Sequence, residues 1–109
     1  MSNQETGGPE YQVWVDDNGH YMDKSARYSE GIFQDCATAI ARCKYIVDQF
    51  LLSSYREGMT AEHLMQTYKF YGEDPWVSSA DDNCNFSAWS YAAERCAEIC
   101  GTITEEAKE

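Results

Sequence analysis

The first clear pattern in the chain is an alternation of apolar and other residues near its start. Tyr11, Val13 and Val15 occupy every second position and are apolar. A period of two is expected of a β-strand with one buried face, because successive side chains point to opposite sides of a strand. We therefore predict a first strand over residues 10–16.

The Asp-Asn-Gly sequence at 17–19 predicts a turn after this strand, since Asn-Gly readily adopts the positive φ angles of a tight hairpin. An immediate return over 20–22 is one possibility. We favour a longer connection through 23–25 and an antiparallel return strand over 27–33, which has the better strand composition.

After position 35, apolar side chains recur every three or four residues, which is the spacing of an amphipathic helix. Asp35 is a suitable N-cap, and Gly58 is expected to close the helix near its end. The apolar stripe consists of Cys36, Ile40, Cys43, Val47, Phe50 and Ser54. One long helix is therefore predicted in this segment.

A second, shorter helix is predicted between Thr60, its N-cap, and Gly72, its stop signal. Leu64, Tyr68 and Tyr71 fall on one side of this helix. We expect these three side chains to face the core.

The last third of the chain predicts one strand and one helix. Pro75 precedes a short segment, 76–79, that suits an edge strand beginning after the proline. Ser87 is expected to cap a last helix and Gly101 to end it. The apolar stripe of this helix comprises Trp89, Ala92 or Ala93, Cys96, Ile99 and Cys100.

The predicted order of elements is β-β-α-α-β-α. Such an order predicts an α+β fold, with a small antiparallel or mixed sheet and helices packed on one of its faces. A length of 109 residues fits one domain. We predict a disordered leader over 1–9, a single domain over 10–101 and a disordered acidic tail over 102–109.

The net charge narrows the range of partners. Nineteen acidic residues against eight basic ones give the chain a formal charge of −11. This charge repels phosphate backbones and anionic membrane surfaces, and the apolar stretches are far too short to span a bilayer. We expect a monomer or weak homodimer that binds neither nucleic acid nor membranes.

The first ten residues lack the basic start and apolar core of a secretory signal, so we expect a cytoplasmic protein. The chain contains an odd number of cysteines, which cannot all pair within one molecule. They are Cys36, Cys43, Cys84, Cys96 and Cys100. In a reducing compartment we expect all five to remain thiols that mostly fill buried volume.

The segments VDDNGHYMD, RYSEGIF and CATAIARCKYIVD resemble a family of short bacterial proteins of unknown function. The resemblance covers the first half to two thirds of the chain, and similar proteins continue with segments like Gly-Glu-Asp-Pro at 72–75 and Phe-Ser-Ala-Trp at 86–89. Because the family has no known activity, the resemblance implies no catalytic or binding residues.

The most polar cluster comprises Asp16, Asp17, His20 and Asp23. Carboxylates beside an imidazole could make the histidine a general base. The simpler interpretation, which we prefer, is a solvated turn in which the acidic residues satisfy backbone groups and face water. The chain has no nucleophile elbow, phosphate-cradling glycine loop or paired-histidine zinc helix that would support an enzyme.

Metal sites receive little support from the spacing of ligands. Counted from Asp16, the sixth residue is Tyr21 rather than glycine, which excludes an EF-hand loop. Cys96 and Cys100 are one helical turn apart, but the chain lacks a Cys-x-x-Cys pair to complete a familiar zinc site. We expect no cofactor.

Aromatic residues give the remaining functional signal, because eight tyrosines and three tryptophans are hard to bury in so small a chain. Trp14, Tyr21 and Phe70 are predicted to lie off the buried faces, where they either line a binding groove or form a second layer of core. We interpret the chain as a small acidic protein-binding or regulatory module without catalytic activity. Its candidate binding residues are Trp14, Asp16, Asp17, His20, Tyr21, Asp23 and Phe70. The alternative is a cryptic enzyme or metal-binding protein that uses the acidic loop.

Overall fold

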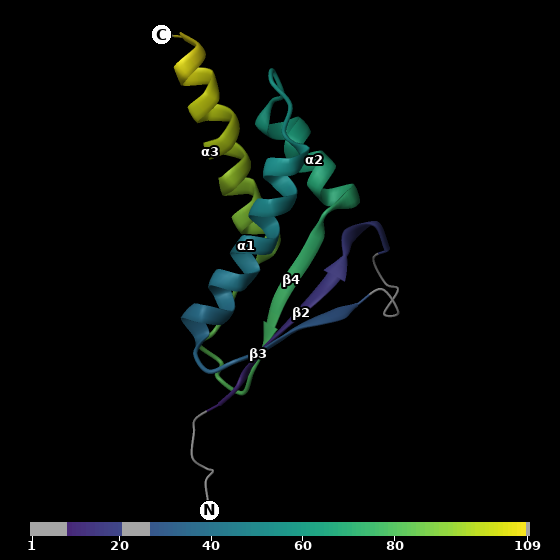
Figure 1. Ribbon diagram of the computed structural model, residues 1–109, viewed down its shortest axis with the longest axis vertical. Helices are drawn as coiled ribbons and strands as arrows, with labels where there is room; N and C mark the ends of the chain where they lie inside the picture. The colour runs from purple at the N-terminus through teal and green to yellow at the C-terminus, as the bar shows by residue number, and fades with distance from the viewer. Residues whose placement is uncertain (1–8, 21–26, 109) are drawn as a thin grey trace, which may run out of the picture.

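The computed structural model describes residues 9–20 and 27–108, without the side chains of His20 and of residues 102–108. The elements are β2 (Tyr11–Asp17), the 3-10 turn η1 (Asn18–His20), β3 (Tyr28–Phe33), α1 (Cys36–Ser54), α2 (Ala61–Tyr71), β4 (Glu73–Ser78) and α3 (Ala88–Lys108) (Figure 1). This order confirms the predicted α+β fold. Most of the predicted leader, residues 1–8, lies outside the described residues.

The three strands form one antiparallel sheet in the order β3-β2-β4. Trp14 of β2 lies opposite Ser29 of β3 and Trp76 of β4. Val13 and Val15 are fully buried toward the helices, so Trp14, between them, points to the other face. The three helices pack on one side of the sheet, and no helix of the described part covers the face that carries Trp14 (Figure 1).

The predicted longer connection between the first two strands is confirmed, because β3 pairs with β2 only from Tyr28 onward. The predicted tight Asn-Gly hairpin turn is wrong. Residues 18–20 form a 3-10 turn instead, in which the backbone N–H of Asn18 donates to the carbonyl of Gly72 at 3.0 Å. The turn is therefore shaped by its contact with the end of α2.

The predicted N-caps are all confirmed. The side chain of Asp35 accepts a hydrogen bond from the Thr38 N–H at 2.8 Å, and that of Thr60 accepts one from the His63 N–H at 3.0 Å. Ser87 Oγ accepts a hydrogen bond from the backbone N–H of Ser90, the third residue of α3, at 3.2 Å. These hydrogen bonds satisfy N–H groups that have no partner inside the helix.

Two predicted helix ends are wrong. α1 ends at Ser54, and Gly58, with a φ of 89°, lies in the following loop. α3 continues through Gly101 to Lys108, so most of the predicted disordered tail is helical. A glycine permits a helix to stop but costs only about 1 kcal/mol in its interior, so it need not stop one.

Gly72 closes α2 as predicted, but for a different reason than expected. Its φ of −81° is one that other residues also adopt. A Cβ atom at this position would collide with the ring and the carbonyl of Tyr68. Glycine is therefore required here for space, and it lets β4 begin immediately beside the tyrosine.

The strand after α2 starts earlier than predicted. β4 begins at Glu73 and contains Pro75, whereas the sequence predicted a start after the proline. Its position at the edge of the sheet is confirmed. An edge strand tolerates proline because only one of its sides makes a hydrogen-bond ladder.

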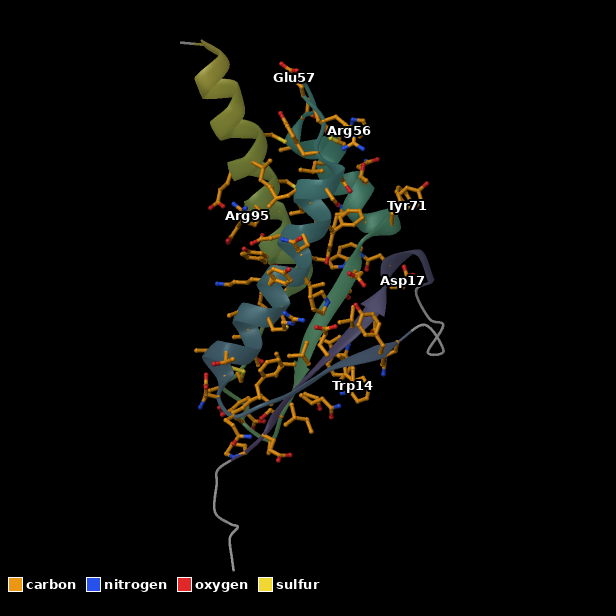
Figure 2. All side chains as sticks on the ribbon, viewed as in Figure 1. Trp14, Asp17, Arg56, Glu57, Tyr71 and Arg95 are labelled. Atoms are coloured by element: carbon orange, nitrogen blue, oxygen red, sulfur yellow. A yellow bond between two sulfur atoms is a disulfide. The ribbon has the colours of Figure 1, made fainter. Side chains whose placement is uncertain are left out.

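The core has two parts, one among the helices and one between α1 and the sheet. Leu64 and Tyr68 are fully buried in the first part, as predicted. The prediction that Tyr71 faces the core is wrong, because 74% of its surface is exposed. Three residues after Tyr68, at the last position of α2, Tyr71 lies beyond the reach of α1 and α3 and points into solvent (Figure 2).

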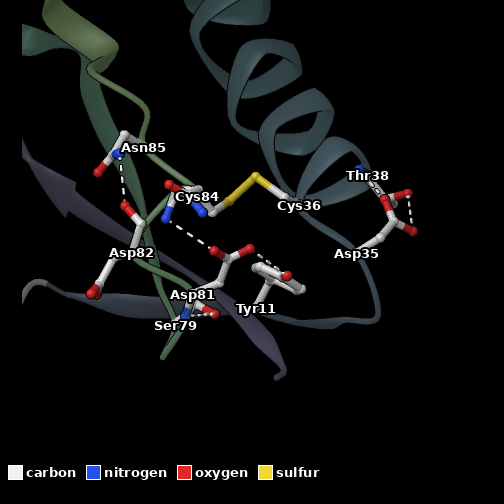
Figure 3. Close-up of a disulfide and its surroundings, with 10 residues drawn as sticks. Tyr11, Asp35, Cys36, Thr38, Ser79, Asp81, Asp82, Cys84 and Asn85 are labelled. Atoms are coloured by element: carbon white, nitrogen blue, oxygen red, sulfur yellow. Dashed lines mark hydrogen bonds between the residues drawn. A yellow bond between two sulfur atoms is a disulfide. The ribbon is translucent and has the colours of Figure 1, made fainter. Parts of the chain in front are cut away.

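A disulfide joins Cys36, the first residue of α1, to Cys84 in the loop before α3 (Figure 3). The prediction of five thiols is therefore wrong for this pair. The fold brings these two residues, 48 apart in sequence, to a Cα–Cα distance of 5.7 Å. Beside the bond, the Tyr11 hydroxyl donates to Asp81 at 2.8 Å, which ties the same loop to β2.

The other three cysteines are buried, as the sequence predicted. Burial raises the pKa of the Cys43 thiol to about 12 and that of Cys96 to about 11. A raised pKa keeps these thiols protonated and unreactive at neutral pH. They fill volume in the core.

Candidate functional site

The predicted acidic cluster is divided by the geometry of β2. Asp16 and Asp17 are neighbours in the strand and therefore point to opposite faces of the sheet. The Asp16 carboxylate accepts a hydrogen bond from Arg27 Nε at 2.6 Å. The Asp17 carboxylate accepts one from the Gly19 N–H at 2.8 Å, which confirms the interpretation of Asp17 as a turn-forming residue.

Other members of the predicted site lie partly or wholly outside the described residues. The backbone of His20 belongs to η1, but its side chain is not described. Tyr21 and Asp23 lie in the segment between the two described ranges. Among the described side chains, no group of three histidine, cysteine or acidic residues is arranged to hold a metal ion.

Trp14 contacts a second tryptophan on the face of the sheet away from the helices. Its ring stacks on Trp76, with 6.5 Å between the ring centroids. The guanidinium of Arg27 lies 5.2 Å above the Trp76 ring and links this pair to Asp16. The predicted binding residues Trp14 and Asp16 thus belong to one cluster, whose charges are already paired.

Phe70, by contrast, lines a pocket with a volume of about 560 Å³. The pocket lies where η1, the end of α2, the start of β4 and the start of α3 meet. Its described lining residues are Asn18, Lys69, Phe70, Asp74 and Trp89. Phe70 is the one predicted binding residue among them.

The buried Tyr68 fixes the elements around this pocket. Its hydroxyl donates to the carbonyl of Glu73 at 2.6 Å, and its own carbonyl accepts from Asn18 Nδ2 at 2.9 Å. Its ring also meets the Trp89 ring edge-on at 6.4 Å between centroids. One residue, through its backbone carbonyl and its buried side chain, therefore holds the end of α2 against the turn, the edge strand and α3.

Two aromatic rings form the apolar part of the pocket. Phe70 is 63% exposed and Trp89 is 40% exposed, which is unusual for large apolar side chains that lie next to a core. The ammonium of Lys69 lies 5.8 Å from the centre of the Trp89 ring. That face of the tryptophan is thus already in contact with a cation.

Asp74 supplies the acidic part of the pocket. Burial raises the pKa of its carboxyl group to about 6, and the nearby carboxylate of Asp16 adds to the shift. The structure shows no hydrogen bond or ion pair to this carboxylate from any described residue. The next residue toward the helix, Glu73, differs in this respect, since it accepts a hydrogen bond from the Tyr28 hydroxyl at 2.6 Å.

The described lining offers two rings, an amide, an ammonium and a carboxyl group, but no serine, cysteine or histidine. A carboxyl group alone can exchange a proton, yet the described lining supplies no serine, cysteine or histidine beside it, and the nearby Asp16 carboxylate is paired with Arg27. This combination of groups suits binding rather than covalent chemistry.

The sequence alone missed four residues of the pocket. The sequence places Asn18 in a turn and Trp89 in an apolar stripe, and it assigns no role to Asp74 or Lys69. One signal was available. The run Lys-Phe-Tyr at 69–71 is too apolar for a helix end that faces only water.

No helix in the described part of the chain combines the length and the apolar character needed to cross a membrane. Comparison with family models, with curated proteins and with solved structures gave no match.

Proposed function

We propose that this protein is a small binding module without catalytic activity and that its protein ligand occupies the pocket beside Phe70 and Trp89. The observation that carries the proposal is the exposure of these two rings around a pocket of about 560 Å³. Aromatic side chains that border a concave site are effective anchors for a partner's side chain. This proposal moves the binding site away from Trp14 and the acidic turn, and it retains Phe70.

The rigidity of the pocket supports this proposal. Tyr68 is fully buried, and its hydrogen bonds to Asn18 and Glu73 hold the surrounding elements in place. A site that is ordered before binding loses less conformational entropy when the partner arrives. The pocket can therefore support useful affinity in spite of its small size.

The acidic surface sets the expected oligomeric state and the class of partner. A net charge of −11 opposes association of two copies, so we propose that the module acts as a monomer or weak homodimer. The same charge accelerates the encounter with a basic protein.

Cytoplasmic localisation remains a prediction of the sequence. The disulfide between Cys36 and Cys84 argues against it, because disulfides persist mainly in oxidising compartments.

The experiment that tests the proposal is selection of peptides from a random display library against the wild-type protein. Dissociation constants of the selected peptides are then measured by fluorescence anisotropy for the wild type, for Phe70→Ala and for Tyr71→Ala. Tyr71 is the matched control, because it is the neighbouring aromatic residue, is 74% exposed and is not among the described lining residues.

We expect Phe70→Ala to weaken binding by about tenfold or more and Tyr71→Ala to leave it unchanged, since truncation of an aromatic anchor typically costs more than 1 kcal/mol. Peptides that bind the wild type and Phe70→Ala equally well would show that the pocket is not the binding site.

A further inference from the structure

Some acidic residues of the described part form an ion pair with an arginine, and others do not. Asp16 is paired with Arg27, and Asp48 with Arg95, at 2.6 and 2.8 Å. Asp74 is withdrawn from solvent to a comparable degree but has no such partner among the described residues. A carboxylate that is partly buried without a counter-ion destabilises the protein unless something outside the chain compensates it.

The strand register increases this imbalance. Asp16 lies directly opposite Asp74 in the β2–β4 pair, so the two carboxyl groups are on the same side of the sheet. Like charges at opposed positions repel each other. Because Arg27 compensates Asp16 only, a positive charge arriving at Asp74 would relieve both its burial and this repulsion.

The aromatic wall of the same pocket is suited to a cation as well. Lys69 already places its ammonium over the Trp89 ring, at 5.8 Å from the centroid. This contact demonstrates that a positive group can approach that face of the ring, where the quadrupole attracts it. Lys69 is itself exposed and can move aside.

We propose that the occupant of this pocket is a lysine or arginine side chain of a protein partner, whose charge is bound by the Asp74 carboxylate and whose aliphatic part packs against Phe70. The inference rests on the proposed function and adds to it the chemistry of the partner. The charge of the whole chain, −11, agrees with a basic partner and attracts it over a distance.

The test compares two probes that share a backbone and a straight four-carbon side chain and differ in the terminal ammonium group. They are Nα-acetyl-lysine N-methylamide and its uncharged analogue, Nα-acetyl-norleucine N-methylamide. Each is titrated at pH 7.5 into the full-length protein labelled with ¹⁵N, and the shifts of the Phe70 and Asp74 amides and the Trp89 indole are followed. We expect the lysine compound to bind about tenfold more tightly than the norleucine compound.

Two pairs of variants assign the effect to this pocket. Asp74→Asn should abolish the preference for lysine, whereas Asp82→Asn, which removes the same charge from an exposed loop position, should retain it. Lys69→Gln should strengthen lysine binding several-fold by removing a competing cation. Lys44→Gln is its control, because the Lys44 ammonium lies over Tyr91, a ring outside the described lining of the pocket.

Equal affinities for the lysine and norleucine compounds would overturn the inference about charge, as would equal losses in Asp74→Asn and Asp82→Asn. Neither result bears on the pocket as a binding site, which the comparison of Phe70→Ala with Tyr71→Ala decides separately. Binding of n-butylamine as tight as that of the lysine compound would point to a small amine and overturn the assignment to a protein side chain.

Discussion

Asp16 and Asp74 lie opposite each other in the β2–β4 pair, and of the two only Asp16 has an arginine bound to it in the described structure. The two carboxyl groups therefore have different environments. Asp16 joins Arg27 and Trp76 in a compensated cluster that stabilises the open face of the sheet. Asp74 is left with an uncompensated charge at the edge of a pocket.

The first prediction is that Asp74→Asn stabilises the protein at neutral pH. Burial raises the folded-state pKa of Asp74 to about 6, above its ordinary value of 3.8. The folded state therefore holds this proton more tightly than the unfolded state, and stability declines as pH rises through 6. Removing the charge should raise the free energy of unfolding by about 1 to 2 kcal/mol at pH 7.5. This is less than the full pKa shift implies, because the carboxyl group is partly exposed.

Chemical denaturation at pH 7.5 and at pH 4 measures this effect. The difference between Asp74→Asn and the wild type should nearly vanish at pH 4, where Asp74 is protonated in the folded state. A variant that is less stable than the wild type at pH 7.5 would mean that the carboxylate has a favourable partner.

The second prediction concerns the pH dependence of lysine binding. Among the described residues, the charged or titratable groups that face Asp74 are Asp16 of β2, Cys43 of α1, and Tyr68 and Lys69 of α2. Burial raises the pKa values of Cys43 and Tyr68, so neither titrates between pH 5 and 7.5. Protonation of Asp74 should therefore dominate, and the affinity for the lysine compound should fall several-fold from pH 7.5 to pH 5.

NMR titrations at several pH values check this expectation. The affinity for the norleucine compound should not change with pH. In Asp74→Asn the lysine affinity should be flat over the same range. A persistent decline in that variant would place the titrating group elsewhere.

The third prediction is that Gly101→Ala stabilises the protein by about 0.5 to 1 kcal/mol, because alanine is favoured over glycine in a helix interior. An added Cβ at Gly101 meets no atom within 4 Å. Gly72→Ala is the opposite case and should be strongly destabilising, since its Cβ would collide with Tyr68. Thermal melts followed by circular dichroism measure both, and a loss of stability in Gly101→Ala would argue that α3 ends at that residue.

Local sequence signals identified most of the fold. The caps Asp35, Thr60 and Ser87 each satisfy a helix N-terminus within three residues, so their roles depend on neighbours in the chain alone. Gly101 and Gly72 show the limit of such reasoning. Whether a glycine ends a helix depends on what packs around it, and the ring of Tyr68 decides that at Gly72.

The candidate site was less predictable because its residues come from four elements. Asn18 and Asp74 meet only because the end of α2 is tied to η1 and β4 through Tyr68. The alternation of side chains in β2 did bear on the predicted acidic cluster. Adjacent residues of a strand face opposite ways, so Asp16 and Asp17 point to opposite sides of the sheet.

The last prediction concerns the disulfide between Cys36 and Cys84, which closes a loop of 48 residues. Loop-closure entropy for a loop of this length gives a stabilisation of about 4 kcal/mol. Reduction, or replacement of both residues by serine, should lower the unfolding free energy by roughly that amount. Mass spectrometry after alkylation under denaturing conditions should count three modified cysteines in the oxidised protein and five after reduction. Five modified cysteines in untreated protein would return Cys36 and Cys84 to the thiol state that the sequence predicted, and with it the case for a reducing compartment.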